Sequence, residues 1–238
     1  MKRAKTPGRR EVEKILKLAG GSADTPMRVE RISGHFVGCP YQIGPLIGSA
    51  DRPEVFVASL TSFDCVTYME TVLSLAEART PQEFERRLCQ MRYRSGAVEW
   101  RKRNHYMVDW IRNNGREGLV REVTLGPKAV VKTRTLNVVP GLPSEIRTFR
   151  CFPKRIVRPA HSPLESGDLI FFASTRPHLD IFHCGLIVKK DGRDLLRHAS
   201  RSQGGVVEQS LLDFLKKNRM AGIIVARPQT PRAPRKRS

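Results

Sequence analysis

Apolar residues recur at helical spacing through the first half of the chain. This pattern predicts helices over about residues 11–19, 25–36, 63–79, 81–91 and 104–114. Two of these helices begin with a typical signal, Thr25 followed by Pro26 and Thr80 followed by Pro81, because a hydroxyl side chain caps a helix and proline fits its first turn. Residues 39–52 are rich in proline and glycine, and we expect a loop there.

The pattern changes to strands at about residue 119, and one short strand is expected earlier, at 55–58. Apolar or alternating runs predict strands at 119–124, 129–138, 169–173, 181–188, 194–200, 206–208 and 223–225, with a short helix at 210–217. Asp191-Gly192 separates two of these runs and is a strong hairpin signal. Residues 144–166 show no clear pattern, and we expect a mobile flap or a positioning loop. Helices that precede an antiparallel sheet indicate an α+β fold in a single domain over residues 11–227.

Composition is consistent with one substantial core. The chain has 238 residues, of which 39% are hydrophobic and 28% charged, and no apolar run approaches the roughly 18–20 residues of a membrane-spanning helix. Half of the net charge of +20 comes from the two ends, since residues 1–10 and 227–238 each hold five basic residues and no acidic one. We therefore expect basic, disordered tails at 1–10 and 228–238.

The basic surface bears on the kind of partner. Basic arms attract phosphate groups, so a non-catalytic module that binds nucleic acid or an anionic wall polymer is one alternative. Aromatic residues make up only 7% of the chain, and no zinc finger or aromatic RNA-stacking motif is visible, so we expect no specific nucleic-acid partner. Five cysteines at irregular spacing argue against a disulfide framework, and no ligand spacing indicates a metal site or a cofactor.

The first residues also bear on compartment. A secretory signal would follow its charges with an apolar stretch of about 7–15 residues. Residues 11–19 form an amphipathic pattern instead, and no signal peptide is visible. We expect a cytoplasmic protein, with export as the alternative if a leader is missing.

Cys65 is the strongest candidate for chemistry. It lies in the first turn of the predicted helix 63–79, where unpaired N–H groups and the helix dipole favour the nucleophilic thiolate. His183 and His198 lie on the two strands of the predicted hairpin, so His183 could act as base and His198 could orient its ring. The alternative is a buried structural cysteine and two structural histidines. Cys184 follows His183 on a strand, points to the other face and is expected to be buried and uninvolved.

The order of nucleophile, base and orienter resembles the NlpC-type papain-fold cysteine amidases of bacterial cell-wall peptides, and within them the branch similar to N-acetylmuramoyl-L-alanine amidases. Matching segments run between about residues 28 and 227, at 36–44, 63–67, 103–106, 109–111, 167–172, 183–186 and 196–200. The resemblance implies a papain-like fold, with N-terminal helices packed on an antiparallel sheet or open barrel. It also implies hydrolysis of an amide bond in peptidoglycan fragments (muropeptides), without a metal or a nucleotide cofactor.

The resemblance also assigns roles to four further residues. Tyr41 would hydrogen-bond near the reacting carbonyl, and Asp64 would help to recognise the peptide portion of the substrate. His105 and Tyr106 lie in an insertion typical of the amidase branch and would contact substrate at the rim of the cleft. The bond cut would be the N-acetylmuramoyl–L-alanine amide, with a peptide bond within the stem or another acyl group as alternatives. Family members are commonly exported, which differs from the cytoplasmic expectation.

Overall fold

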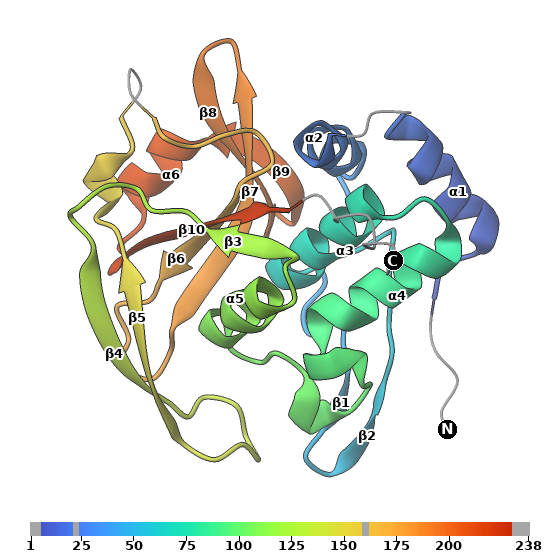
Figure 1. Cartoon of the computed structure of the whole chain (residues 1–238), viewed down its shortest axis with the longest axis horizontal. Coiled ribbons are helices and arrows are strands. Elements are labelled where there is room, and N and C mark those ends of the chain that lie inside the picture. The colour runs from blue at the N-terminus through green and yellow to red at the C-terminus, as the bar shows by residue number, and fades with distance from the viewer. Residues whose placement is uncertain (1–5, 21–23, 159–161, 230–238) are drawn as a thin grey trace, which may run out of the picture.

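The computed structural model describes residues 6–20, 24–158 and 162–229. Its helices are α1 (Arg9–Leu18), α2 (Thr25–His35), α3 (Cys65–Glu77), α4 (Pro81–Arg92), α5 (Met107–Arg116) and α6 (Leu211–Lys217). Short 3₁₀ turns occur at η1 (Arg94–Gly96), η2 (Trp100–Lys102) and η3 (Lys154–Ile156). The helices α1 to α4 form one side of the molecule in Figure 1, and the sheet forms the other.

The main sheet has six strands in the order β3-β10-β6-β7-β8-β9, and all neighbours are antiparallel. They are β3 (Val120–Glu122), β6 (Leu169–Ala173), β7 (Ile181–Lys190), β8 (Arg193–Ser200), β9 (Gly205–Ser210) and β10 (Gly222–Pro228). Two separate hairpins are β1 (Ile47–Ser49) with β2 (Arg52–Val55), and β4 (Val130–Leu136) with β5 (Glu145–Cys151). The predicted combination of helices with an antiparallel sheet is confirmed.

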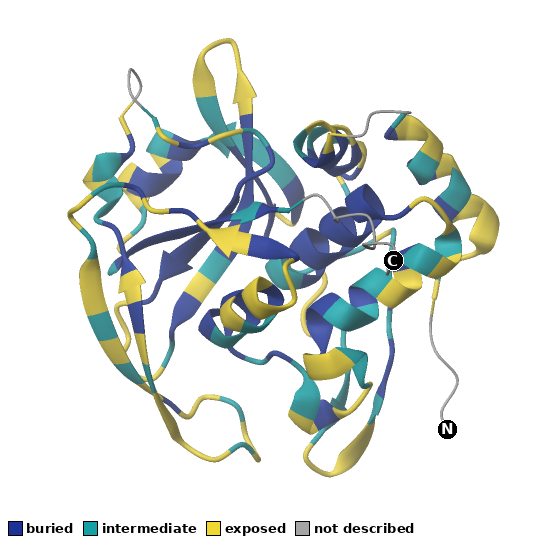
Figure 2. Cartoon of the chain, in the orientation of Figure 1, coloured by how far each residue is buried: buried dark blue, intermediate teal, exposed yellow. Residues whose placement is uncertain are grey.

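The sheet is covered on both faces, and β6 shows this most clearly. Its side chains alternate between two cores: Phe171 packs in the larger core with α2, α3 and α5, and Phe172 packs in the smaller core with α6. In α3, 11 of 13 residues are buried, so this helix is central to the larger core. Figure 2 shows α3 almost wholly in the colour of buried residues.

Buried polar contacts hold α3 in place. Glu70 accepts hydrogen bonds from Arg92 Nε at 2.7 Å and from Trp110 Nε1 at 3.1 Å, which ties α3 to α4 and α5. At the other end of α3, Arg28 Nε donates to the Ala76 carbonyl at 2.6 Å and satisfies a group that the helix leaves unpaired. These contacts hold α3 in place among α2, α4 and α5.

Two predicted loops contain strands. The segment 39–52 includes β1 and the start of β2, and the segment 144–166 includes β5. Neither β4 nor β5 has a continuous apolar face, and the two strands are joined by their backbone ladder and by a contact between Thr133 and Thr148 at 3.1 Å. The strand predicted at 129–138 corresponds to β4, whereas β5 leaves little apolar periodicity in the sequence and was not predicted.

The ends of the domain differ slightly from expectation. Helix α1 begins at Arg9, so Arg9 and Arg10 of the predicted tail are helical. The last strand ends at Pro228, and the Gln229 amide donates to the Leu119 carbonyl at 2.9 Å. The other residues of the two predicted tails, apart from 6–8, lie outside the described residues. No helix in the described part of the chain is long and apolar enough to cross a membrane.

Candidate functional site

Cys65 is the first residue of α3, and the entry of the chain into this helix determines its position. Asp64 caps the helix, because its Oδ1 accepts a hydrogen bond from the Thr67 amide at 2.7 Å. The Thr67 hydroxyl in turn accepts a hydrogen bond from the Asp64 amide at 3.0 Å. The predicted position of Cys65 in the first turn is confirmed, and the helix dipole there favours a thiolate.

His183 on β7 and His198 on β8 form a close pair. The Nε2 of His183 lies 2.5 Å from the Nδ1 of His198, and the two ring planes are 80° apart. This bond occupies Nε2 of His183, which leaves Nδ1 as the nitrogen available to Cys65. A hydrogen bond links Cys65 with His183. The structure therefore brings together the three residues that the sequence predicted as nucleophile, base and orienter.

A β-bulge places His183. Ala173 pairs with Ile181 and Phe172 pairs with His183, so Phe182 is an extra residue in β7 directly before the histidine. Bulges bend a strand and re-aim the side chains next to them. The His183 ring stacks on Phe172, with ring planes 11° apart, and lies 5.7 Å from the Phe214 ring of α6. These apolar neighbours fix the orientation of the imidazole.

The two neighbouring thiols have opposite pKa shifts. A hydrogen bond from the Cys184 thiol is the largest cause that lowers the pKa of Cys65 well below its usual value; hydrogen bonding and charge at His183 add to it, against the effect of burial. The bond with Cys65, followed by burial and the Cys65 charge, raises the pKa of Cys184. These opposite shifts favour the thiolate at Cys65 and the thiol at Cys184.

The expectation that Cys184 is uninvolved is wrong. Its side chain is buried as predicted, with 1% exposed, but its Sγ also donates to the Cys65 carbonyl oxygen at 3.4 Å. His183 and Cys184 are adjacent on a strand and leave it on opposite faces. Helix α3 packs on the face that carries Cys184, which brings this thiol to Cys65.

Tyr41 and Asp64 lie in the electrostatic surroundings of Cys65. An isolated parallel bridge joins Tyr41 to Phe63, and the Gln42 amide donates to the Phe63 carbonyl at 2.8 Å. Burial, with the Cys65 and Asp64 charges, raises the pKa of Tyr41 to about 12, so its hydroxyl stays protonated and can donate. Burial and then the Cys65 charge raise the pKa of Asp64 to about 6, although its cap bonds oppose this.

His105 and Tyr106 lie in a different pocket. The His105 Nε2 is 2.8 Å from the Trp100 carbonyl oxygen, and burial, together with the charge of Arg103, lowers the pKa of His105 to about 4 although that hydrogen bond opposes the shift. Tyr106 is buried, and its hydroxyl accepts a hydrogen bond from the Val139 amide at 3.4 Å. None of the residues around the candidate nucleophile lines this pocket. The structure therefore separates these two residues from the other predicted site residues.

Gln209 is a site residue that the sequence did not reveal. Its amide nitrogen lies 2.6 Å from Nε2 of His198, so a row of polar groups runs from Gln209 through His198 to His183. The predicted strand 206–208 ended one residue before it. Gln209 lies diagonally across the ladder from His198, which pairs with Val207. The signal that was available is the spacing: Gln209 is polar and lies two residues after Val207, the strand partner of His198, so it shares the same face of the sheet.

No cluster of three or more histidine, cysteine or acidic side chains within residues 6–20, 24–158 and 162–229 could hold a metal ion. The site built from Cys65, His183 and His198 contains a thiol whose pKa is lowered, a hydrogen-bonded imidazole pair and nearby phenol and carboxyl groups. Such a set can support attack on a carbonyl carbon and the proton transfers that accompany it.

Solved structures resemble this fold closely. A Legionella pneumophila protein of the family designated DUF1460 has a TM-score of 0.80 at 22% identity, over 93% of this chain and 94% of that one. An N-acetylmuramoyl-L-alanine amidase from Bacteroides uniformis has a TM-score of 0.77 at 25% identity, over 86% and 99% of the two chains. A Bacteroides fragilis protein provisionally named a xylanase has a TM-score of 0.73 at 28% identity, over 82% and 98%. No curated protein matches the chain.

These likenesses define the class: a protein of helices and antiparallel sheets with an amidase-like fold. The family follows from the sequence. The family described as N-acetylmuramoyl-L-alanine amidase-like (AmiA-like) matches residues 31–223, which is most of the chain. The chain belongs to this family. The matched range includes Cys65, His183, His198 and Gln209.

Proposed function

We propose that this chain is a cysteine amidase that hydrolyses the N-acetylmuramoyl–L-alanine bond of peptidoglycan fragments. The observation that carries the proposal is the row formed by Cys65 at the start of α3, His183 on β7 and His198 on β8. Within this row, hydrogen bonds to Cys184 and His183 lower the pKa of Cys65. Family membership supports the choice of bond and substrate. The helix that carries the nucleophile packs on the antiparallel strands that carry the base, which supports an NlpC-type papain-like fold.

The chemistry begins with Cys65 and His183. The Cys65 thiolate, whose proton is on His183, attacks the amide carbonyl of the lactyl group, and a sulfur–carbon bond forms. The Cys65 amide, one of the first N–H groups of α3, and the Tyr41 hydroxyl are the donors proposed for the oxyanion. His183 then protonates the alanine nitrogen as the carbon–nitrogen bond breaks. Finally, His183 takes a proton from water, and the hydroxide releases the acyl group from Cys65.

His198 and Gln209 set the direction of the hydrogen bonds behind the base. Burial and the nearby His183 charge lower the pKa of His198 to about 3, so its ring is neutral at pH 7. When His183 carries two protons, its Nε2–H donates to Nδ1 of His198, and Nε2–H of His198 then needs an acceptor. The side-chain oxygen of Gln209 can supply it when the amide is turned to present that atom. We assign Gln209 as a positioning residue.

The carboxyl groups favour an amidase over a glycosidase. Most glycosidases use two carboxyl groups, one as acid and the other as nucleophile or base. The two acidic residues closest in sequence to Cys65 on α3 both have structural partners, because Asp64 caps the helix and Glu70 binds Arg92 and Trp110. These two carboxyl groups are therefore not a free acid–base pair.

The test is hydrolysis of purified muropeptides, with products identified by mass. We expect the intact protein to release the free stem peptide from the sugar and Cys65→Ala to lose this activity. Cys89→Ala is the matched control, because Cys89 is a half-buried thiol on α4 outside the site. Gln209→Leu should lower kcat and leave KM nearly unchanged. A product cut within the stem would reassign the bond, and full activity of Cys65→Ala would refute the cysteine mechanism.

A further inference from the structure

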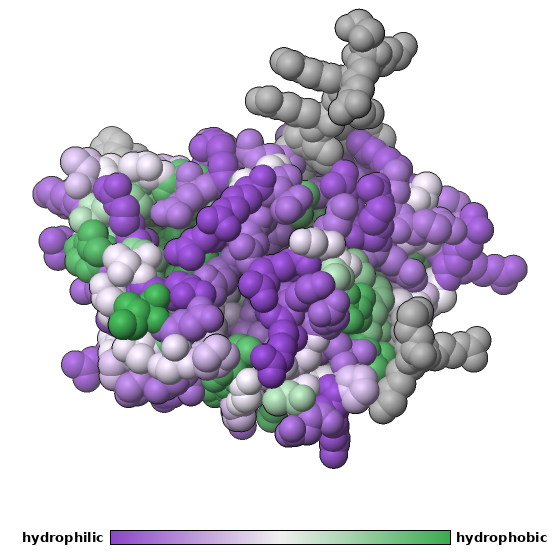
Figure 3. All heavy atoms as spheres, turned by 60° about the horizontal axis from the view of Figure 1, so that its bottom comes forward, coloured by the Kyte–Doolittle hydropathy of each residue, from purple (hydrophilic) through white to green (hydrophobic). Residues whose placement is uncertain are grey.

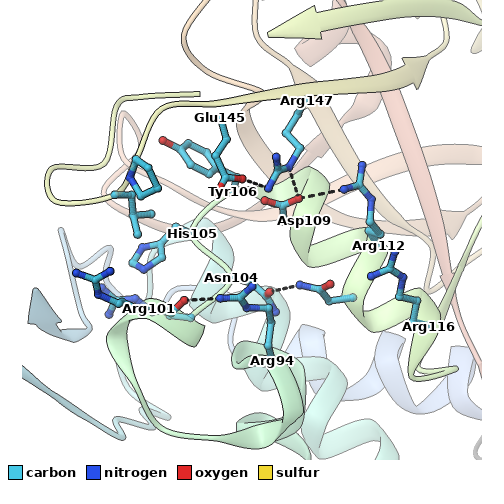
Figure 4. Close-up of a pocket in the computed structure, with 14 residues that line it drawn as sticks. Arg94, Arg101, Asn104, His105, Tyr106, Asp109, Arg112, Arg116, Glu145 and Arg147 are labelled. Atoms are coloured by element: carbon cyan, nitrogen blue, oxygen red, sulfur yellow. Dashed lines mark hydrogen bonds and ion pairs between the residues drawn. The ribbon is translucent and has the colours of Figure 1, made fainter. Parts of the chain in front are cut away.

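The pocket that contains His105 and Tyr106 is rich in arginine. It has a volume of about 220 Å³ and lies between the segment 94–106, the helix α5 and the strand β5 (Figure 4). Six arginines and two acidic residues line it: Arg94, Arg101, Arg103, Arg112, Arg116 and Arg147, with Asp109 and Glu145. The lining therefore has an excess of four positive charges. Figure 3 shows that the side of the molecule at the bottom of Figure 1 is largely hydrophilic.

Some of these arginines have acidic partners. Arg147 donates to Asp109 Oδ1 at 2.8 Å and also binds Glu145, so its charge is largely neutralised. Arg112 lies 3.6 Å from the same Asp109 oxygen. Arg103 donates to Glu54, at 3.1 Å, outside the pocket. Asp109 and Glu145, the two acidic residues of the lining, thus both form ion pairs with arginines of the same lining.

The other three arginines, Arg94, Arg101 and Arg116, have no acidic partner among the described residues. Arg94 donates only to the backbone carbonyl of Arg101, at 2.7 Å. The side chains of Arg101 and Arg116 are exposed and have no hydrogen-bond or ion-pair partner among the described residues. Arg112 and Arg116 are four positions apart on α5, where like charges face each other and destabilise a helix unless an anion lies between them.

The floor of the pocket is held in place by hydrogen bonds. Asn113 donates to Asn104 Oδ1 at 2.7 Å, and Asn104 donates to the Met91 carbonyl at 3.1 Å. His105 is fixed by its bond to Trp100 and packs edge-on against that ring. A floor held by hydrogen bonds, with an exposed and positively charged rim, is suited to a ligand that supplies negative charge.

From this arrangement we propose that the pocket is a binding site for a small anion with two or more negative charges, borne on phosphate or clustered carboxylate groups. Guanidinium groups bind both in a bidentate manner. The cavity is large enough for one such group and too small for a chain of sugars. Figure 4 shows Arg101 and Arg116 at opposite ends of the pocket, where their unpaired side chains supply positive charge, and Arg94 adds a third charge.

The inference does not rest on the proposed amidase activity, because no residue of the Cys65 site lines this pocket. The two regions are nevertheless joined through the scaffold. The Val108 amide of α5 donates to Asp180 Oδ2 at 2.8 Å, and Asp180 directly precedes the strand that carries His183. Binding is therefore measured directly rather than through activity.

The experiment is calorimetric titration of the intact protein with inorganic pyrophosphate and, separately, with citrate at low ionic strength. The test variant is Arg101→Gln/Arg116→Gln, which removes the two unpaired charges and no internal contact. The matched control is Arg86→Gln/Arg121→Gln, because these arginines are also exposed but do not line the pocket. We expect the test variant to bind at least about tenfold more weakly than wild type and the control to stay within about twofold.

Each outcome has a definite meaning. Stronger binding of pyrophosphate supports a phosphate-bearing ligand, and stronger binding of citrate supports a carboxylate-bearing one. Equal weakening in both double variants would mean that only the overall charge attracts anions, and the proposal would be overturned. Absence of measurable binding by wild type to either anion would also overturn it. The imidazole of His105 offers a second readout, because a bound anion would shift its proton NMR signal in wild type and in the control alone.

Discussion

At the scale of single residues, the site depends on how two cysteines share protons. Cys65 and Cys184 come from segments far apart in the chain, and the thiol of Cys184 is bound to the Cys65 carbonyl oxygen. The same thiol is the largest influence that lowers the pKa of Cys65. A buried cysteine that takes no part in the proposed reaction can therefore control the protonation of the cysteine that is proposed to attack the substrate.

Cys184→Ala should raise the pKa of Cys65, because it removes the hydrogen bond from the Cys184 thiol that lowers this pKa, while Cys65 stays buried. The measurement is the pH dependence of iodoacetamide labelling, with the Cys65 peptide followed by mass spectrometry. We expect the midpoint of labelling to move to higher pH in Cys184→Ala and less in Cys184→Ser, whose hydroxyl can still donate. Cys89→Ala is the control and should leave the midpoint in place. An unchanged midpoint in Cys184→Ala would contradict the assigned interaction.

At the scale of elements, β7 and β8 approach each other closely where the two histidines lie. A Cβ atom on Gly185 would lie 2.8 Å from a Leu196 methyl group and 2.9 Å from the His198 Cβ. Both distances are shorter than side-chain carbons tolerate, so glycine is needed for this approach. The turn of the same hairpin has positive φ at both Asp191 and Gly192, which is the geometry of a type I′ turn.

Gly185→Ala should displace His198 and destabilise the sheet by about 1–3 kcal/mol, the usual effect of overpacking. The control is Gly115→Ala in α5, where the added Cβ would be 3.8 Å from the Val120 carbonyl oxygen and alanine favours the helix. Urea unfolding of both variants measures the difference. Equal stability of Gly185→Ala and wild type would show that the hairpin adapts, and the argument for this glycine would fail.

At the scale of the whole molecule, buried ionisable groups give opposing contributions to the pH dependence of stability. Burial raises the pKa of Glu77 to about 7, since its one ionic partner, Arg87, is 3.7 Å away. A carboxyl group whose pKa is raised in the folded state binds more protons there, so its contribution to stability falls as pH rises from about 4.5 to 7. The lowered pKa values of His105 and His198 act in the opposite sense: their contribution rises with pH up to about 6.5.

Glu77→Gln isolates one of these contributions. The variant keeps the shape of the protonated side chain, so its stability relative to wild type should be nearly constant below pH 4.5. It should then increase between pH 4.5 and 7 and level off above, by on the order of 1–3 kcal/mol. Urea unfolding of both proteins at a series of pH values measures this difference. Glu85→Gln on the exposed part of α4 is the control, and a flat difference for Glu77→Gln would refute the raised pKa.

The sequence by itself determined most of the elements and the place of the nucleophile. Helix and strand periods are local properties, so α3, α4, β6 and the β7–β8 hairpin follow from spacing, caps and one turn signal. Cys65 at a helix start and His183 and His198 on paired strands follow from the same local patterns. The strand predicted at 129–138 also corresponds to β4, but β5 was not predicted, because its side chains are mostly solvent-exposed and its stability lies in cross-strand pairing.

The tertiary structure decided which side chains meet. The bulge at Phe182 and the packing of α3 bring both His183 and Cys184 to Cys65, and the β8–β9 register brings Gln209 to His198. Three separate segments supply the arginines of the pocket around His105. Such contacts depend on register, bulges and the packing of distant elements, and periodicity along a chain carries no information about them.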